Sequence, residues 1–197
     1  MSGEKIGPGR LVAVVGPSGS GKDSIMGAAR ELLAGDERIV FPRRVITRDA
    51  DIHEDHIPIS EQEFRQAEAG GAFALSWRAH GLSYGIARDT DLMIRNGSTV
   101  ILNVSRTIVP LLRERYRNLT VIVISVDPLR LGQRLAGRGR ETQAEIQRRI
   151  ARARQEKVTG PDVVEIDNNG PLQDAIDRFV LTIAPHLKAG RTASGGL

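Results

Sequence analysis

The segment Gly16-Pro17-Ser18-Gly19-Ser20-Gly21-Lys22 has the residue types and spacing of a phosphate-binding loop. Its glycines allow the backbone to curl into a nest of inward-pointing N–H groups. The start of a helix behind it would add further N–H groups and a positive dipole end. Lys22 supplies a cation that can reach the outer phosphates of a nucleotide. We therefore expect these seven residues to bind nucleotide phosphates, and a glycine-rich turn without a ligand is the alternative.

The residue after the lysine departs from the common P-loop pattern. That position usually holds Ser or Thr, whose hydroxyl contacts Mg²⁺. Here it holds Asp23, and Ser24 follows. A carboxylate is also a hard oxygen ligand of the kind that Mg²⁺ prefers. We expect Asp23, Ser24 or both to serve the metal, directly or through water, while phosphate binding depends on the backbone and Lys22.

Arginines form a second group of residues that could take part in binding or catalysis. Arg130, Arg134 and Arg138 are four residues apart and would share one helix face. Like charges at this spacing repel by roughly 0.2–0.5 kcal/mol per pair, so the arrangement favours an anion facing them. Beside a P-loop, that anion would be a transferring phosphoryl group, whose oxygens arginine stabilises. A solvated basic face and an RNA-binding surface are the alternatives.

Basic residues also lie at the end of the second predicted strand and just after it, in Arg43-Arg44-Val45-Ile46-Thr47-Arg48. Ligands of open α/β sheets bind beyond the carboxyl ends of the strands, which places Arg48 well for a second phosphate. Acidic residues come next, so a surface turn with local ion pairs is the alternative. In residues 73–85, we assign Trp77 to packing and His80 to a turn.

Strands and helices alternate along the chain and would position these groups. Strands are predicted at 11–15, 38–47, 72–79, 99–104, 119–126 and 163–166, with a turn at 81–85. Helices are predicted at 22–34, 60–70, 88–95, 107–116, 127–136, 141–158 and 171–187. Ser60 and Glu63 form a capping-box pattern at the second helix. The alternation predicts an α/β fold with a parallel central sheet and helices on both faces.

Composition fits a globular protein that consists of one domain, or of one domain with a small lid. The chain has 197 residues, 40% hydrophobic and 26% charged, with a formal net charge of +4. Cysteine is absent, which suits a reducing cytoplasm, and no apolar run approaches a membrane span. The polar residues 1–9 and 188–197 are expected to be a flexible N-terminus and a disordered tail. Only four Phe, two Tyr and one Trp are present, which argues against a nucleic-acid partner that stacks on aromatics.

The order of these motifs resembles the guanylate kinase family over nearly all of residues 10–187. The matching residues are the P-loop, Thr47-Arg48, the block from Phe73 to Tyr84-Gly85, the run Arg134-Leu135-Ala136-Gly137-Arg138-Gly139, Arg149 and Asn168. The resemblance implies a P-loop kinase fold with a helical lid at about 134–152 and an acceptor-binding subdomain at about 44–86. It implies that Lys22, Arg134, Arg138 and Arg149 are catalytic and that Asn168 contacts the adenine of ATP.

Several positions depart from the guanylate kinase pattern. The position of the family's guanine-reading glutamate holds Leu75, and that of a second glutamate holds Arg78. The position of a second acceptor-phosphate arginine holds Asp51, and that of an acceptor-phosphate tyrosine holds His56. The position of an aspartate at a strand end holds Ser105. The acceptor-phosphate tyrosine at Tyr84 is kept. An acceptor that carries phosphate but no guanine would fit this pattern.

Four segments are similar to those of the ribose 1,5-bisphosphate phosphokinases of phosphonate breakdown. They are Gly21-Lys22-Asp23-Ser24, Ile46-Thr47-Arg48, residues 74–85 and Asn103-Val104-Ser105-Arg106. The similarity implies transfer of the γ-phosphoryl of ATP to ribose 1,5-bisphosphate, with Mg²⁺ as cofactor and no membrane partner. The implied acceptor contacts are Arg48 and Tyr84, joined by Arg44, Ser76 and His56.

Three alternatives remain open at this point. The first is a guanylate kinase, or another nucleoside-monophosphate kinase, with an altered pocket. The second is a guanylate kinase-like binding module without catalysis, and the third is an RNA-binding domain on the basic helices. The sequence leaves the oligomeric state open, a homodimer included.

Overall fold

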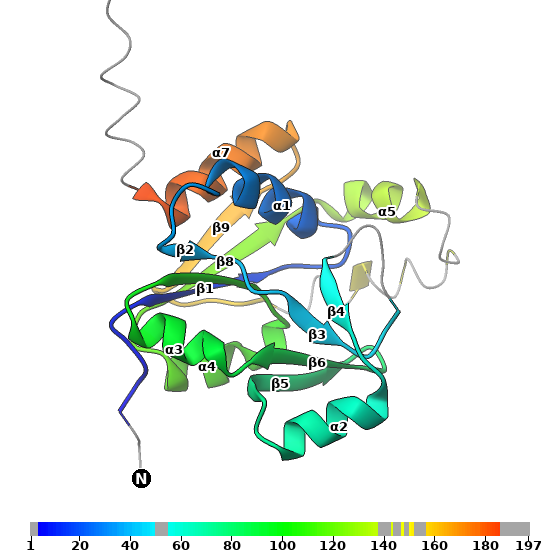
Figure 1. Cartoon of the computed structure of the whole chain (residues 1–197). Helices are drawn as coiled ribbons and strands as arrows, with labels where there is room; N and C mark the ends of the chain where they lie inside the picture. Colours follow the sequence, from blue (N-terminus) through cyan, green and yellow to red (C-terminus); the bar gives the residue numbers. More distant parts are fainter. Residues whose placement is uncertain are drawn as a thin grey trace, which may run out of the picture. The chain divides into compact units, whose positions relative to one another are not determined.

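The computed structural model describes residues 4–49, 55–137, 143, 147, 150–151 and 157–185 (Figure 1). Most of the helix expected at 141–158 lies outside these residues, and so do Arg138, Arg149 and Asp51. The tail expected at 188–197 also lies outside them. The chain divides into two compact units, residues 1–13 with 36–120 and residues 14–35 with 121–197, which are described separately below.

The first unit holds most of the strands and four helical segments. In chain order these are β2 (Ile39–Val40), β3 (Arg44–Ile46), β4 (His56–Pro58), α2 (Glu61–Ala69), β5 (Phe73–Ala79), β6 (Leu82–Ala87), α3 (Asp89–Arg95), β7 (Thr99–Asn103), the 3₁₀ helix η1 (Arg106–Ile108) and α4 (Val109–Arg115). The second unit holds α1 (Lys22–Leu32), α5 (Pro128–Gly137), β9 (Val163–Asp167) and α7 (Leu172–Ile183). Strands β1 (Arg10–Val15) and β8 (Leu119–Ser125) have residues in both units.

A five-stranded sheet has the strand order β2-β7-β1-β8-β9, and its β2–β7 and β8–β9 pairs are parallel. Residues Leu11 to Val15 of β1 are fully buried. A strand that is covered on both faces needs a continuous run of apolar residues. Such a run is visible in the sequence, and this is why the central strands of this sheet were predicted correctly. The predicted α/β fold with a parallel central sheet is confirmed.

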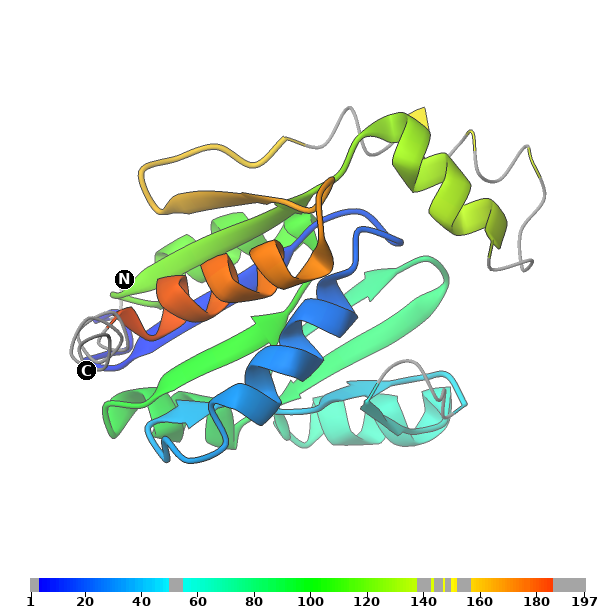
Figure 2. The ribbon, with the colours of Figure 1, turned by 90° about the horizontal axis from the view of Figure 1, so that it is seen from above.

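In the second unit, helices α1 and α7 lie side by side (Figure 2). Helix α1 buries Ile25 and Ala29, and α7 buries Ala175, Ile176 and Phe179. These residues recur three or four positions apart, so each helix presents one apolar stripe to its neighbours.

The first unit also contains a second sheet, with the strand order β4-β3-β6-β5. Strands β3 and β4 run parallel, and β6 is antiparallel to both β3 and β5. Helix α2 lies against β5 and β6 (Figure 1) and buries Phe64, whose ring centroid lies 4.7 Å from that of Phe73. The capping box expected at Ser60 and Glu63 is present.

Strand β4 was not predicted from the sequence, and this sheet differs from the prediction at two further places. Residues 38–47 were expected to form one strand but form β2 and β3 in different sheets. The break contains Pro42, which has no N–H to donate to a ladder. Residues 81–85 were expected to be a turn but belong mostly to β6. The turn is only His80 and Gly81, with φ of 54° and 75°, the left-handed pair that suits a two-residue hairpin.

The N-terminal segment is more structured than expected. Its backbone pairs with the end of α4, since the N–H of Ile6 donates to the Arg115 carbonyl at 2.8 Å and the N–H of Arg117 donates to the Ile6 carbonyl at 2.8 Å. The N–H of Gly9 donates to the carbonyl of Ile94. Residues 4–9 therefore belong to the folded unit. Among the helices in the described part of the chain, none has the length and apolar character that a membrane crossing requires.

Candidate active site

The P-loop follows β1 and runs into α1, in the strand–loop–helix order that the sequence predicted. Gly16, Gly19 and Gly21 have positive φ angles of 151°, 89° and 91°. A Cβ atom at Gly16 would lie 2.5 Å from the carbonyl oxygen of Ile124, and one at Gly21 would lie 2.5 Å from the side-chain nitrogen of Asn168. The curvature of the loop therefore requires glycine at both positions.

Lys22 is the first residue of α1, and its ammonium group reaches back over the loop. It donates hydrogen bonds to the carbonyls of Gly16 at 2.9 Å and Pro17 at 3.0 Å. The cation thus lies at the start of the loop, whose following helix start favours an anion. A phosphate held by the loop would be within reach of this side chain.

Asn168 joins the P-loop to the end of β9. Its side-chain amide nitrogen donates to the carbonyl of Ser20 at 2.7 Å, and its backbone N–H donates to the carbonyl of Ser125 at 2.9 Å. The residue is only 1% exposed. We expected Asn168 to contact adenine, but this burial leaves its amide little surface for a base. The geometry fits a role in supporting the loop.

Arg134, on α5, contacts the same point of the loop. Its guanidinium donates to the carbonyl of Asn168 at 2.9 Å and to the carbonyl of Ser20 at 3.4 Å. It is the one lid arginine of the three we predicted that falls within the described residues. Arg138 and Arg149 lie outside them, so their closure over the phosphoryl group stays a prediction.

The side chains expected to serve Mg²⁺ follow directly after Lys22. Asp23 and Ser24 are both exposed at the first turn of α1. A carboxylate and a hydroxyl are hard oxygen donors that suit this ion. In the part of the chain that the structure describes, no group of three or more His, Cys, Asp or Glu residues could hold a metal. The residues fit an ion that takes one or two ligands from the protein and the rest from phosphates and water.

Two of the five predicted acceptor residues come together on one face of the second sheet. Arg44 on β3 has its guanidinium carbon 5.7 Å from the ring centroid of Tyr84 on β6. The same tyrosine ring stacks on Trp77 of β5, with centroids 5.2 Å apart and planes 4° apart. Leu75 lies two residues before Trp77 on β5 and is 3% exposed, so the position of the family's guanine-reading glutamate is closed.

Ser76 lies on the opposite face of this sheet from Tyr84. It precedes Trp77, and successive residues of a strand point to opposite faces. Hydrogen bonds from Arg78 and then from Ser76 lower the pKa of Glu68, a residue of α2. Ser76 therefore faces α2, and the structure does not bring it to Tyr84. The sequence pattern did not reveal this, because the register of β5 depends on a hairpin that we expected to be a longer turn.

His56 supports the backbone that carries Arg48. It is 5% exposed, and its Nε2 atom lies 3.2 Å from the carbonyl oxygens of both Arg48 and Asp49. Both partners only accept hydrogen bonds, so the Nε2 position carries the hydrogen. This geometry fits a role of His56 in holding the turn after β3, and the direct acceptor binding that we had expected stays a prediction.

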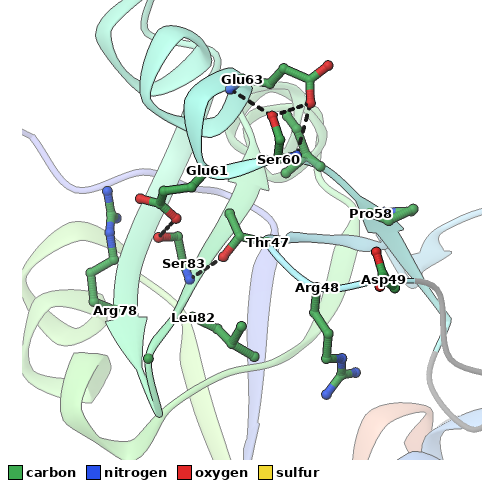
Figure 3. A pocket seen from close by; sticks show the side chains of 12 residues that line it. Thr47, Arg48, Asp49, Pro58, Ser60, Glu61, Glu63, Arg78, Leu82 and Ser83 are labelled. Carbon is green, nitrogen blue, oxygen red and sulfur yellow. Dashed lines mark hydrogen bonds between the residues drawn. The ribbon is translucent and has the colours of Figure 1, made fainter.

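A pocket of about 760 Å³ lies between this turn, the start of α2 and the β5–β6 hairpin (Figure 3). Among its lining residues, Ser83 donates its backbone N–H to the Thr47 hydroxyl at 2.8 Å and its own hydroxyl to Glu61 at 2.8 Å. Figure 3 shows Arg48 extending away from these groups. The sequence analysis did not single out Thr47 for this contact or Ser83 for any role.

The charges of this pocket do not suit a bisphosphate. It is lined by two arginines, Arg48 and Arg78, and by three carboxylates, Asp49, Glu61 and Glu63. Arg78 is paired with Glu68 at 2.7 Å. Hydrogen bonds from the Ser60 hydroxyl and then from its backbone lower the pKa of Glu63, which favours the charged form. The acceptor phosphates are therefore not expected beside Glu61 and Glu63, and Arg48 is the one residue of this lining that we assign to the acceptor.

Comparisons with known proteins agree with this arrangement. No protein-family model matches the chain. A guanylate kinase from Anaplasma phagocytophilum superposes with a TM-score of 0.64 at 18% identity, covering 92% of this chain and 87% of its own. A gluconokinase from Sinorhizobium meliloti superposes with a TM-score of 0.51 at 16% identity, covering 97% and 99%. These likenesses show the fold, a P-loop α/β fold of the guanylate kinase-like kind.

Curated relatives narrow the class further. A protein of Thiobacillus denitrificans named ribose 1,5-bisphosphate phosphokinase PhnN is 47% identical to this chain, over 87% of this chain and 91% of the relative. A Rhodopseudomonas palustris protein of the same name is 45% identical, over 87% of each. A Brucella melitensis protein of the same name is 47% identical over 87% of this chain and 90% of its own. The chain belongs to the ribose 1,5-bisphosphate phosphokinase family.

Proposed function

We propose that this protein transfers the γ-phosphoryl group of ATP to the 1-phosphate of ribose 1,5-bisphosphate, yielding 5-phospho-α-D-ribose 1-diphosphate and ADP in phosphonate catabolism. The observation that carries the proposal is the 47% identity, over 87% of the chain, to a relative with that name. The buried Leu75 adds support, because a leucine there offers no hydrogen bond to a guanine edge.

On the donor side, Gly16 to Lys22 bind the phosphates of ATP. The backbone N–H groups of the loop and of the first turn of α1 contact the phosphate oxygens, and Lys22 turns from the loop carbonyls to the outer phosphates. Asn168 and Arg134 hold the Ser20 carbonyl, so that the loop keeps its shape when the nucleotide is absent. Arg138 and Arg149 contribute further positive charge to the transferring group.

Magnesium is the proposed cofactor, held by Asp23, by Ser24 or by both. These side chains would hold the ion beside the phosphates, where it would supply positive charge to offset the charge that develops on the transferring group. The carboxylate of Asp23 would lower the net positive charge around the phosphates, which Lys22 and the arginines offset.

On the acceptor side, Arg48 and Tyr84 bind the phosphate groups of the sugar. Arg48 supplies a planar, charged fork that matches phosphate oxygens, and Tyr84 supplies a hydroxyl donor. The acceptor oxygen is already anionic, so the transfer needs no general base. Positioning and charge neutralisation carry the catalysis. We further propose a cytoplasmic location and a small-molecule partner.

The test compares two acceptors under the same conditions. We would measure kcat/KM for ribose 1,5-bisphosphate and for GMP at equal Mg·ATP, and identify the product by the phosphorus resonances of a new diphosphate. Preference for ribose 1,5-bisphosphate is the expected result. Preference for GMP would make the protein a guanylate kinase with an unusual pocket, and turnover of neither would favour the non-catalytic module.

A further inference from the structure

Tyr84 is flanked by side chains from both neighbouring strands. In the strand order β4-β3-β6-β5, its own strand β6 lies between β3 and β5. Trp77 on β5 is its direct cross-strand partner, and their rings stack in parallel planes at 5.2 Å. Arg44 on β3 lies over the same ring at 5.7 Å. The tyrosine ring therefore has an aromatic neighbour from one strand and a cationic neighbour from the other.

The two flanking side chains are themselves held in place. Trp77 is only 7% exposed. The guanidinium of Arg44 donates to the carbonyl of Asn103, the last residue of β7, at 3.0 Å. The stack thus connects β5 and β6 to the carboxyl end of β7 within the first unit, and rotation of the Tyr84 ring would disturb contacts on both sides.

Stacking of this kind selects one orientation of a tyrosine. A free tyrosine samples several rotamers, and fixing one before binding lowers the entropy that binding must overcome. Offset stacking between aromatic rings and a cation over a ring both favour a fixed ring plane. The hydroxyl at the end of the ring is then fixed as well.

We propose that Trp77 and Arg44 are positioning residues that hold Tyr84 in the orientation in which its hydroxyl binds a phosphate of the acceptor. This inference rests on the proposed function, since Tyr84 is assigned to the acceptor there. It gives Trp77 a role beyond packing. It also changes the role of Arg44, which acts through Tyr84 and not by contacting the acceptor.

A double-mutant cycle tests the coupling. Trp77→Leu should raise the KM for ribose 1,5-bisphosphate by about two- to tenfold, the range expected for the loss of one aromatic pair, while the KM for ATP and kcat stay near wild type. Trp77→Phe keeps a stacking ring and should restore most of the affinity. In a Tyr84→Phe background, which lacks the hydroxyl, Trp77→Leu should have little further effect.

Arg44 is tested in the same way. Arg44→Gln should raise the acceptor KM in the wild-type background and change it little in the Tyr84→Phe background. The matched control is Arg78→Gln. Arg78 also lies over an aromatic ring, that of Phe64 at 4.8 Å, but on the α2 face of the sheet. Its replacement should leave the acceptor KM within about twofold of wild type.

Trp77 provides a readout that is independent of turnover, because the chain has a single tryptophan. Adding ribose 1,5-bisphosphate without ATP should change the emission of Trp77 in wild type, and Tyr84→Leu should change the emission of the free protein. Equal effects of Trp77→Leu with and without the tyrosine hydroxyl would mean that Trp77 acts only on general stability, and would overturn the proposal. A full effect of Arg44→Gln in the Tyr84→Phe background would overturn it for Arg44.

Failure of the proposed function can be distinguished from failure of the positioning proposal by the acceptor that the wild-type enzyme uses. A wild-type enzyme that binds and consumes GMP but not ribose 1,5-bisphosphate would contradict the acceptor before any variant is compared. The positioning proposal fails separately, if the sugar bisphosphate is used and the cycles show no coupling of Trp77 or of Arg44 to Tyr84.

Discussion

The side-chain amide of Asn168 donates a 2.7 Å hydrogen bond to the backbone carbonyl of Ser20, and this contact fixes the P-loop against the end of β9. Gly21, the next residue of the loop, passes so close that a Cβ atom there would lie 2.5 Å from the same amide nitrogen. Arg134 also donates to the Ser20 carbonyl, from α5. One carbonyl of the loop is thus held from two elements of the second unit.

Replacement of Asn168 by aspartate should weaken ATP binding. The change removes the donor and places a carboxylate oxygen against the Ser20 carbonyl, in a site that is 1% exposed. Loss of this buried hydrogen bond, with repulsion between the carboxylate and the carbonyl in its place, costs about 1–3 kcal/mol, so we expect the affinity for ATP to fall about tenfold. Calorimetric titration with ATP, alongside a thermal unfolding scan, measures both binding and folding.

Asn118 offers a matched control for this prediction. Its amide also donates to a backbone carbonyl at 2.7 Å, that of Pro8 in the first unit. Asn118→Asp should leave ATP affinity unchanged. Equal ATP affinity in Asn168→Asp and wild type would show that the loop keeps its shape without this bond.

Lys22→Ala should yield a folded protein that transfers phosphate poorly. In the structure the ammonium group donates to the carbonyls of Gly16 and Pro17, and the residue is only half-buried, so its truncation should leave the fold intact while removing a cation from the phosphate-binding loop. We expect kcat/KM to fall by more than tenfold, a loss of at least about 1.4 kcal/mol of transition-state stabilisation. Steady-state kinetics with a far-UV spectrum of the variant checks both parts, and retention of over a tenth of the wild-type value contradicts the assigned role.

The P-loop was predictable from the sequence because its signal is local: three glycines, a lysine and the flanking strand and helix lie within a few residues. The roles of Asn168 and Ser76 were not predictable in this way. Asn168 meets Ser20 across 148 residues of chain. The face on which Ser76 lies depends on the register of β5 against β6, and a tight turn at His80-Gly81 sets that register.

That tight turn was the signal that the sequence analysis missed. A pair such as His80-Gly81, in which glycine is the second residue, favours a hairpin with a two-residue turn when it stands between two segments with strand character. Such a turn places Trp77 and Tyr84 opposite each other, since they are equally distant from it. Assigning residues 81–85 to a longer turn hid this pairing, and with it the stack that surrounds Tyr84.

The stability of the protein should fall at high pH through Tyr116. This buried tyrosine, at the end of α4, donates its hydroxyl to Asp91 at 2.8 Å, and Arg115 also pairs with Asp91. Burial, and then the charge of Asp91, raise the pKa of Tyr116 well above its ordinary value. The folded state therefore keeps the phenol proton at a pH where the unfolded chain loses it.

The sign follows from this difference in proton binding. The stabilising effect is complete below the ordinary pKa of about 10 and declines above it, by up to about 1.4 kcal/mol for each pH unit. The free energy of unfolding from urea titrations between pH 8 and 11 should fall more steeply for wild type than for Tyr116→Phe, which has no phenol to ionise. Parallel pH profiles for the two proteins would show that Tyr116 does not titrate differently in the folded state.

Thr47 should set the position of Arg48 and thereby the affinity for the acceptor. The Thr47 hydroxyl accepts the backbone N–H of Ser83 at 2.8 Å (Figure 3). The Thr47 N–H also donates to the Ser83 carbonyl at 3.1 Å. Thr47→Val keeps the shape of the side chain but leaves the Ser83 N–H without this acceptor, which costs about 1–3 kcal/mol. The turn that carries Arg48 should loosen as a result. We expect the KM for ribose 1,5-bisphosphate to rise about three- to tenfold while the KM for ATP, whose phosphates bind the P-loop, stays near wild type.

Thr47→Ser and Ser83→Ala are the controls for this variant. Thr47→Ser keeps the hydroxyl, so its acceptor KM should remain near that of wild type. Ser83→Ala removes the hydrogen bond to Glu61 but keeps the backbone N–H that Thr47 accepts. Since only Thr47→Val breaks the contact beside Arg48, it alone should raise the acceptor KM. A similar rise in Ser83→Ala would indicate that the start of α2, and not the turn after β3, governs acceptor binding.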